Sequence, residues 1–283
     1  MKDASSQPVN PFMTDAFARV YEETGERITG QASRAALKYT GNIEPGHRIL
    51  DIAAGTGALT IPAAEMGANV TAIDIAPGMV RRLASKIGSF PNAEALEMDG
   101  ARMDFPDGAF DLTFSIFGVI VFTDWRKGLT EQCRVTRSGG RGCVVTWRDP
   151  SGGGPFQIMA ASIGRALPDR SPAFKPEAFV RLSEPDHLIA EMEAAGFQDV
   201  SVEEIECYWE GPAGEAYLEQ LRALHSYMPP YVMLSPEDKL LVDEEVVRLS
   251  QSKAVDGKLR LPSTVLIAVG TKADATPHQS TVL

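Results

Sequence analysis

The sequence predicts an α/β fold: a sheet of seven strands with helices on both faces and a helical lid. From residue 47 to 147, apolar runs typical of buried strands alternate with helix-like segments, which implies right-handed βαβ crossovers and a parallel sheet. The first apolar run, 48–52, leads into a glycine-rich turn, and the second, 70–74, ends in an acidic side chain. This order is typical of a Rossmann-like sheet, which binds ligands outside the carboxyl ends of its strands.

Helical signals come first along the chain, over residues 10–40, because apolar side chains recur about one turn apart and 32–39 is rich in helix formers. Gly41 and Pro45-Gly46 then mark the entry to the first strand. Residues 110–115 and 142–147 are expected to form the fourth and fifth strands, and the glycines of 152–155 a loop.

The C-terminal half continues with a helix, a strand, two more helices and a last strand. The predicted bounds are 184–195, 200–208, 214–228, 235–252 and 262–271, with a break at Pro229-Pro230. We expect one domain over 1–271, with its core at about 45–150 and a lid made from 1–40 and 211–252. Residues 272–283 lack periodicity and are expected to form a flexible tail.

The glycine turn favours a nucleoside ligand without phosphates. Gly55 and Gly57 allow close approach of the backbone to a ligand, and Asp74 follows Gly55 at about the spacing of an acid that binds a ribose diol. Thr60 stands where a dinucleotide-binding loop has its third glycine, which weakens the case for a pyrophosphate at the helix N-terminus.

Composition excludes several classes of function. A formal net charge of −11, without a run of Lys or Arg, argues against a nucleic-acid partner. No apolar stretch approaches the ~18 residues of a membrane span, and residues 1–8 lack the apolar core of a secretory signal. The three cysteines and four histidines suggest no metal-ligand cluster. We expect a cytoplasmic protein that acts on a small molecule without a metal; its oligomeric state stays open.

The stretch from Arg48 to Thr60 resembles motif I of the class I S-adenosylmethionine (SAM)-dependent methyltransferases. Residues 95–111 resemble the third motif of that class, and Arg134-Val-Thr-Arg-Ser-Gly-Gly-Arg141 resembles its turn into strand five. The resemblance covers about residues 45–150. It implies SAM as the methyl donor and S-adenosylhomocysteine as the product.

The loop Phe117-Gly118, followed by Val121, is similar to that of the ubiquinone/menaquinone-biosynthesis methyltransferases. That family usually has Arg-Asn inside the loop, whereas this chain has Ile120-Val121. The chain also resembles fungal secondary-metabolism methyltransferases, among them the gliotoxin-type dithiol S-methyltransferases.

The class resemblance implies roles for residues near the glycine turn. Asp51 would bind the amino group of the methionine moiety, Asp74 the ribose, Met79 the adenine face, and Asp99 the adenine edge with the amides that follow it. Ser115 and Ile116 would line the methyl pocket. The expected cofactor contacts are Asp51, Ala53, Gly55, Thr56, Gly57, Asp74, Ile75, Met79, Asp99, Gly100, Ala101, Ser115 and Ile116.

Aromatic residues at lid and loop positions predict an apolar cavity for the methyl acceptor. The candidate substrate contacts are Phe12, Phe17, Tyr21, Phe117, Phe156 and Tyr227. His225, beside Tyr227 in the expected lid, is the one histidine placed to meet a substrate and the one candidate base; its alternative is a structural role.

No pair of side chains suggests a built-in base. A thiol acceptor needs none, since its pKa of about 8.5 leaves some thiolate near neutrality. A phenol or a carbon acid commonly does need one. The primary hypothesis is therefore S-methylation of a small apolar thiol in secondary metabolism or detoxification. The alternatives are O- or C-methylation of a phenolic or quinone-like ring, and a non-catalytic SAM-binding regulator.

Overall fold

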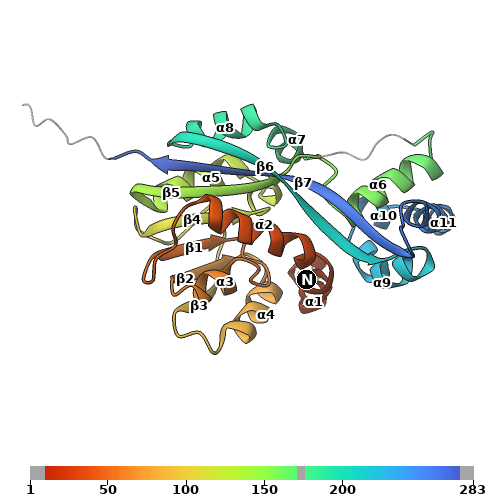
Figure 1. Cartoon of the computed structure of the whole chain (residues 1–283), viewed down its shortest axis with the longest axis horizontal. Helices are drawn as coiled ribbons and strands as arrows, with labels where there is room; N and C mark the ends of the chain where they lie inside the picture. The colour runs from red at the N-terminus through yellow and green to blue at the C-terminus, as the bar shows by residue number, and fades with distance from the viewer. Residues whose placement is uncertain (1–9, 171–175, 275–283) are drawn as a thin grey trace, which may run out of the picture.

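The computed structural model describes residues 10–170 and 176–274. Its sheet has the strand order β3-β2-β1-β4-β5-β7-β6 (Figure 1). The strands are β1 (Arg48–Ile52), β2 (Asn69–Asp74), β3 (Ala93–Glu97), β4 (Phe110–Ile116), β5 (Thr136–Trp147), β6 (Phe197–Pro212) and β7 (Lys258–Lys272). Strands β1 to β5 pair in parallel, and β7 runs antiparallel to both β5 and β6. The predicted Rossmann-like sheet of seven strands is confirmed.

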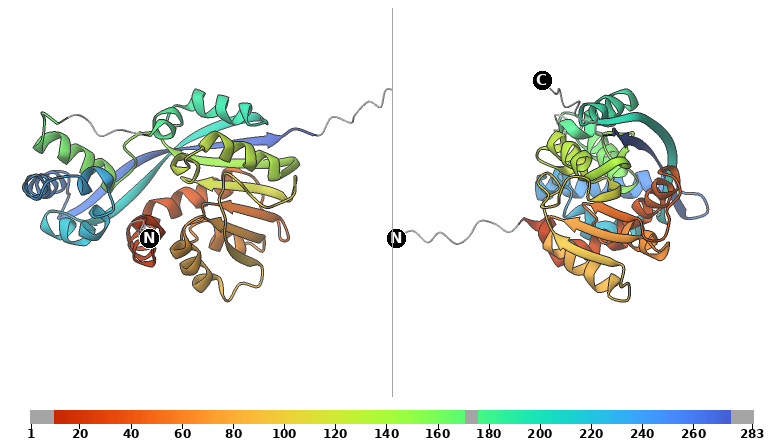
Figure 2. Two further views of the ribbon diagram at one scale, coloured as in Figure 1. Left: turned by 180° about the vertical axis from the view of Figure 1, so that it is seen from behind. Right: turned by 90° about the vertical axis from the view of Figure 1, so that its left-hand side faces the viewer.

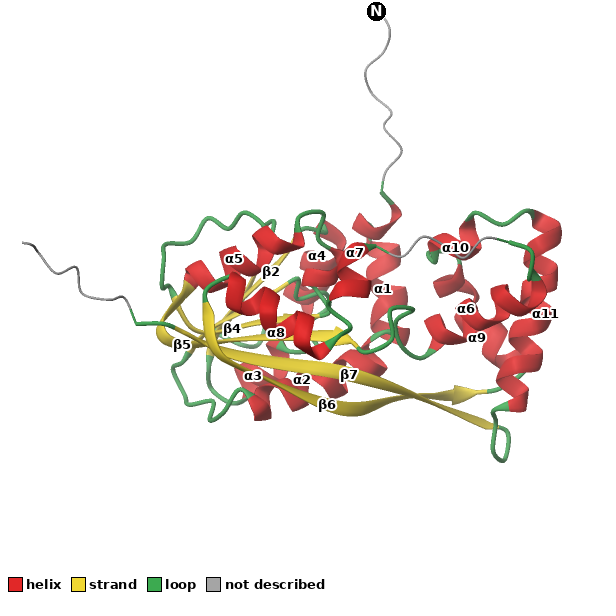
Figure 3. Ribbon diagram, turned by 90° about the horizontal axis from the view of Figure 1, so that it is seen from above, coloured by secondary structure: helices red, strands yellow, loops and turns green. Residues whose placement is uncertain are grey.

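The helices cover both faces of the sheet, as predicted. They are η1 (Pro11–Met13), α1 (Asp15–Thr24), α2 (Glu26–Tyr39), α3 (Thr60–Glu65), α4 (Pro77–Ile87), η2 (Val119–Val121), α5 (Trp125–Val135), α6 (Pro155–Ala166), α7 (Glu177–Arg181), α8 (Pro185–Ala194), α9 (Glu215–His225), α10 (Pro229–Val232) and α11 (Pro236–Ser252). Figure 3 shows α2 and α3 on one face and α5 and α8 on the other. Right-handed crossovers leave β1 and β4 in opposite directions along the sheet, so their helices lie on opposite faces.

The central strands are apolar because both of their faces are covered. Ile49, Leu50 and Ile52 of β1 and Phe114 of β4 are fully buried. Asp51 is the polar exception within β1 and is equally buried. A buried carboxyl group is costly unless it is paired or hydrogen-bonded, and such costly groups are typical of functional sites, which directs attention to the carboxyl end of β1.

The β6–β7 hairpin extends past the edge of the sheet. Strand β5 stops pairing with β7 at the pair Trp147–Val265, whereas β6 and β7 remain paired as far as Pro212–Lys258. Residues 206–212 and 258–264 therefore form a two-stranded ribbon, and helices α9, α10 and α11 connect its two strands. Helix α6, which follows β5, packs with them at the far end of the ribbon, and these four helices are here called the cap (Figures 1 and 3). The predicted strands 200–208 and 262–271 were too short, because β6 and β7 keep pairing with each other beyond the edge of the sheet, as far as Pro212 and Lys258.

Three other local predictions need correction. Strand β5 begins at Thr136 rather than at 142, because the predicted turn is an irregularity within the strand where Gly139 adopts a φ of +68°. Helix α6 follows the predicted loop directly, with Pro155 at its first position. Proline is tolerated there because an N–H group at that position would have no hydrogen-bond partner within the helix. Pro229 likewise starts the short helix α10 instead of only breaking the chain.

The predicted tail begins inside β7, since Lys272 ends that strand and its Nζ donates to the Arg134 carbonyl at 2.8 Å. Residues 275–283 of that tail lie outside the described residues. Across 10–170 and 176–274, no helix combines the length and apolar character required to cross a membrane.

Candidate functional site

The glycine loop after β1 has an unusual backbone. Ala53, Gly55 and Gly57 have φ values of 58°, 56° and 98°, a region that only glycine adopts readily. A methyl group on Gly57 would lie 2.5 Å from Leu83 Cδ1. Strain at a non-glycine residue is typical of functional sites, and here it opens the loop backbone at the carboxyl edge of the sheet.

Two carboxyl groups flank this loop. Asp74, at the end of β2, accepts hydrogen bonds from the amides of Gly55 (2.9 Å) and Ala76 (2.8 Å), and burial raises its pKa. Asp51 is fully buried and accepts a 2.6 Å hydrogen bond from the Thr60 hydroxyl. Burial, with a smaller contribution from Asp74, raises the pKa of Asp51 to about 7. A buried carboxyl group that is stabilised by Thr60 but has no cationic partner among the described residues fits an incoming cation.

These features fit SAM residue by residue. The Asp51 carboxylate would pair with the ammonium of the methionine moiety. Besides the hydrogen bonds that it accepts from the Gly55 and Ala76 amides, the Asp74 carboxylate has further lone pairs, and these can accept hydrogen bonds from the hydroxyls of a ribose. The loop needs no phosphate partner.

The predicted adenine side is more open. Asp99 is exposed and accepts a 2.8 Å hydrogen bond from the Ala101 amide. Gly100 packs so closely on Ile52 and Phe122 that a methyl group there would lie 2.5 Å from Phe122 Cζ. Ile75 is half exposed. Met79 is buried and packs against Phe17 and Tyr21 of α1 rather than standing free.

The predicted methyl pocket lies at the end of β4. Ser115 Oγ accepts from the Val119 amide at 3.0 Å, and a methyl group on Gly118 would lie 2.6 Å from Ala53 Cβ. Phe117 has a φ of 56° and stacks on Trp147 at 4.0 Å between ring centroids. Trp147 is not among the predicted site residues, although its place at the end of the fifth strand was an available signal. Ile116 is partly buried beside these residues.

Helices α1 and α2 close over the glycine loop. The Thr56 hydroxyl donates to Glu26, and Lys86 of α4 contacts Glu26 (3.1 Å) and Glu22 (2.9 Å). Tyr21 lies against Gly55, with its Cε1 3.4 Å from where a glycine methyl group would be. Burial, followed by the repulsion of nearby carboxylates, raises the pKa of Tyr21 to about 12. Tyr21, predicted to contact the substrate, therefore lies at the cofactor loop.

Four predicted substrate residues form one aromatic cluster. Phe17 contacts Phe12, Tyr21 and Tyr227 with ring centroids 5.0, 6.1 and 4.9 Å apart. Tyr227, which follows α9, brings the cap against α1, and Figure 2 shows α1 on the cap side of the sheet. Phe156 stands apart: it is 43% exposed on α6 and makes none of these ring contacts among the described residues.

His225 ends α9 and is buried, with its ring near Tyr217 (6.4 Å) and Tyr231 (5.7 Å). Neither ring nitrogen has a hydrogen-bond partner among the described residues. Burial, with a smaller effect of Arg222, lowers the pKa of His225 to about 4. The imidazole is therefore neutral near pH 7 and too weak a base to take a proton from an ordinary phenol.

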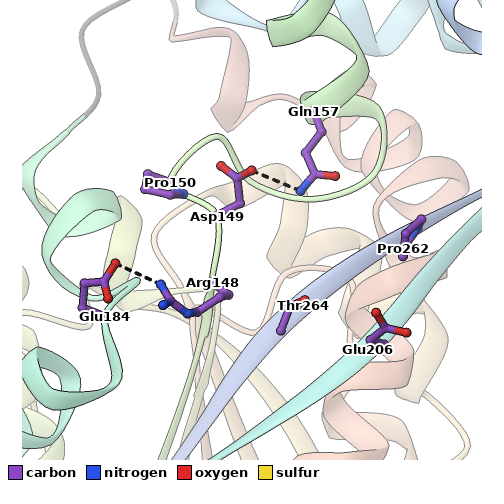
Figure 4. Close-up of a pocket in the computed structure, with 8 residues that line it drawn as sticks. All are labelled: Arg148, Asp149, Pro150, Gln157, Glu184, Glu206, Pro262 and Thr264. Atoms are coloured by element: carbon purple, nitrogen blue, oxygen red, sulfur yellow. Dashed lines mark hydrogen bonds and ion pairs between the residues drawn. The ribbon is translucent and has the colours of Figure 1, made fainter.

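A separate groove of about 450 Å³ lies beside the β6–β7 ribbon (Figure 4). Its lining is polar: Arg148 contacts Glu184 at 2.9 Å, and Asp149 accepts a 3.5 Å hydrogen bond from Gln157. No predicted site residue lines this groove. Within the described ranges, no cluster of His, Cys, Asp and Glu is arranged to hold a metal ion.

Comparisons with known proteins agree with this geometry. The methyltransferase domain family matches residues 49–140. The demethylmenaquinone methyltransferase of Mycolicibacterium gilvum (strain PYR-GCK) is 34% identical over 204 residues, which cover 66% of this chain and 86% of that protein. A second such enzyme, from Mycolicibacterium vanbaalenii, shows the same identity and coverage.

Solved structures show the same fold. The phosphoethanolamine N-methyltransferase 2 of Haemonchus contortus, in complex with S-adenosyl-L-methionine, aligns with a TM-score of 0.57 at 18% identity, over 95% of this chain and 61% of that one. The YcgJ protein of Bacillus subtilis aligns with a TM-score of 0.53 at 17% identity, over 87% of this chain and all of that one.

These relatives favour an enzyme over a non-catalytic regulator, and they lend no support to thiol specificity. The glycine loop, the two carboxyl groups and the 34% identity to a relative covered over most of its length lead to one conclusion. The chain belongs to the class I SAM-dependent methyltransferases, alongside the demethylmenaquinone methyltransferases, and SAM is its cofactor.

Proposed function

We propose that this enzyme transfers the methyl group of SAM to a quinone-like or phenolic ring. The observation that carries the proposal is the aromatic cluster of Phe12, Phe17 and Tyr227, which lies next to the cofactor loop through Tyr21. Planar rings pack well on such side chains. The demethylmenaquinone methyltransferases to which the chain is similar are named for a quinone substrate, which supports the same class.

The residues of this chain act mainly by placement. SAM supplies an activated methyl group on a sulfonium, so the protein must align the acceptor and exclude water. Phe117 and Trp147 stack on each other at the end of β4, and α1 packs over the glycine loop through Tyr21. Because His225 has a pKa of about 4, the acceptor must ionise through its own acidity rather than through this imidazole. A ring hydroxyl made acidic by a conjugated carbonyl meets that requirement.

The thiol hypothesis remains a second candidate, and one observation favours it. Among the described residues, no hydrogen-bond partner orients His225 to act as a general base. A thiol acceptor does not require a general base.

One experiment separates the two candidates. The enzyme is incubated with SAM that carries a deuterated methyl group and with a matched set of acceptors: a hydroxylated naphthoquinone, a naphthol and a naphthalene dithiol. Mass spectrometry counts the transferred methyl groups, and NMR locates them on carbon, oxygen or sulfur. We expect turnover of the quinone. Turnover of the dithiol alone would refute the ring proposal. Tyr227→Ala removes a ring that contacts Phe12 and Phe17, and it should raise the KM for the preferred ring while leaving the affinity for SAM nearly unchanged.

A further inference from the structure

Five buried side chains among the described residues have hydrogen-bonding atoms without partners. Two are the helical serines Ser33 and Ser162, and the other three are rings, with unpaired Trp209 Nε1, Tyr217 Oη and both ring nitrogens of His225. All three side chains are at most 1% exposed. An unpaired buried polar group costs roughly 1–3 kcal/mol, so three in one place need an explanation.

The three rings form a row in which each contacts the next. Trp209, on the projecting ribbon, meets Tyr217 of α9 edge-on at 5.4 Å between centroids, and Tyr217 meets His225 at 6.4 Å. His225 is two residues before Tyr227, which contacts Phe17 of the aromatic cluster. Tyr227 thus joins this part of the cap, along the chain, to the aromatic cluster.

At the other end of this row of rings, Trp209 lies near the loop that follows β5. A methyl group on Gly154 would lie 3.0 Å from Trp209 Cβ, and one on Gly153 would lie 2.3 Å from Trp147 Cζ3. Trp147 stacks on Phe117 at the end of β4. The contacts thus run from the methyl pocket, through Trp147 and the cap, to Phe17 and Tyr21 at the cofactor loop. These contacts link the predicted methyl pocket to the aromatic cluster that is proposed to hold the acceptor.

We propose that Trp209, Tyr217 and His225 are the residues that select the acceptor, by hydrogen bonding to oxygen substituents on its ring. This inference rests on the proposed ring substrate and deepens it. The indole N–H can only donate, whereas the phenol and the neutral imidazole can each donate or accept. Together they suit a ring with two oxygen substituents, one of which accepts a hydrogen bond from Trp209. A hydrocarbon ring would leave all of these groups unpaired.

The test compares acceptor rings with two, one or no oxygen substituents: 1,4-dihydroxynaphthalene, 1-naphthol and naphthalene. Their dissociation constants are measured by calorimetry on the enzyme loaded with S-adenosylhomocysteine, for wild type, Tyr217→Phe and Trp209→Phe. Loss of one hydrogen bond should reduce the preference for the dihydroxy ring over naphthalene by roughly five- to tenfold. Affinity for S-adenosylhomocysteine should not change.

Tyr231→Phe is the matched control. It removes a cap phenol whose hydroxyl is already paired, since it donates to Asp243 at 2.9 Å. Thermal unfolding is measured in parallel. We expect Tyr231→Phe to lower the Tm with the ring preference intact, and Tyr217→Phe to keep or raise the Tm while the preference falls.

The inference is overturned if Tyr217→Phe and Trp209→Phe both bind the three rings with wild-type preference, or if Tyr231→Phe alters that preference as much as they do. Failure of the proposed function is seen separately, as wild-type enzyme that binds the dihydroxy ring but methylates none of the rings.

Discussion

Neutralising Asp51 should make the protein more stable and its cofactor site weaker. In Asp51→Asn the amide oxygen can still accept the hydrogen bond of Thr60, which is 2.6 Å long in the wild type, so the main change is loss of a buried negative charge. Because the stabilising and the binding effects have opposite signs, general damage to the fold cannot imitate the result.

The magnitude follows from the pKa of Asp51, which burial raises from 3.8 to about 7. The native state therefore holds a proton that the unfolded chain releases between these two values. Stability linked to this group is fully present below pH 3.8 and is lost as the pH rises to 7. At about 1.4 kcal/mol per pKa unit, the loss reaches about 4 kcal/mol above pH 7. The asparagine variant escapes this loss.

The assay is urea unfolding of wild type and Asp51→Asn at a series of pH values from 4 to 8, with Asp104→Asn as an exposed control. The gain in the free energy of unfolding should be below about 1 kcal/mol at pH 4 and should level off near 4 kcal/mol above pH 7. Calorimetry should show SAM affinity reduced roughly tenfold or more, as for a lost charged hydrogen bond. A gain independent of pH, or a destabilised variant at pH 8, would refute the reasoning.

Three further changes probe the cofactor loop and its closure. Asp74→Ala should weaken SAM binding at least about tenfold by calorimetry, and a folded variant with unchanged affinity would argue against its role at the ribose. Gly78→Ala places a methyl group 2.4 Å from the backbone of residue 14, so it should push α1 off α4 and raise the KM for the acceptor with circular dichroism unchanged; wild-type kinetics would show that α1 does not close the site. Lys86→Gln removes ion pairs to α1 and α2, and should raise the same KM a few-fold, an effect that about 1 M salt reproduces in wild type only.

The geometry around the glycine loop could be predicted from the sequence, because it depends on residues that are close along the chain or on adjacent parallel strands. A parallel strand that ends in glycines fixes where the backbone opens. The carboxyl ends of adjacent parallel strands meet at one edge of the sheet, so the nearness of Asp51, Gly55 and Asp74 followed from their order alone. The strain at Ala53 did not follow, because alanine gives no local signal for a positive φ.

The acceptor side depended on contacts between distant segments. The sequence predicted Phe17 and Tyr227 as substrate contacts, but only the tertiary structure places their ring centroids 4.9 Å apart. The sequence shows that the side chains of Trp209 and Tyr217 are large and aromatic, but not whether their polar atoms find hydrogen-bond partners. The length of the β6–β7 ribbon sets where the cap lies. Backbone pairing between residues 206–212 and 258–264 decides that length, across some 50 residues of intervening chain.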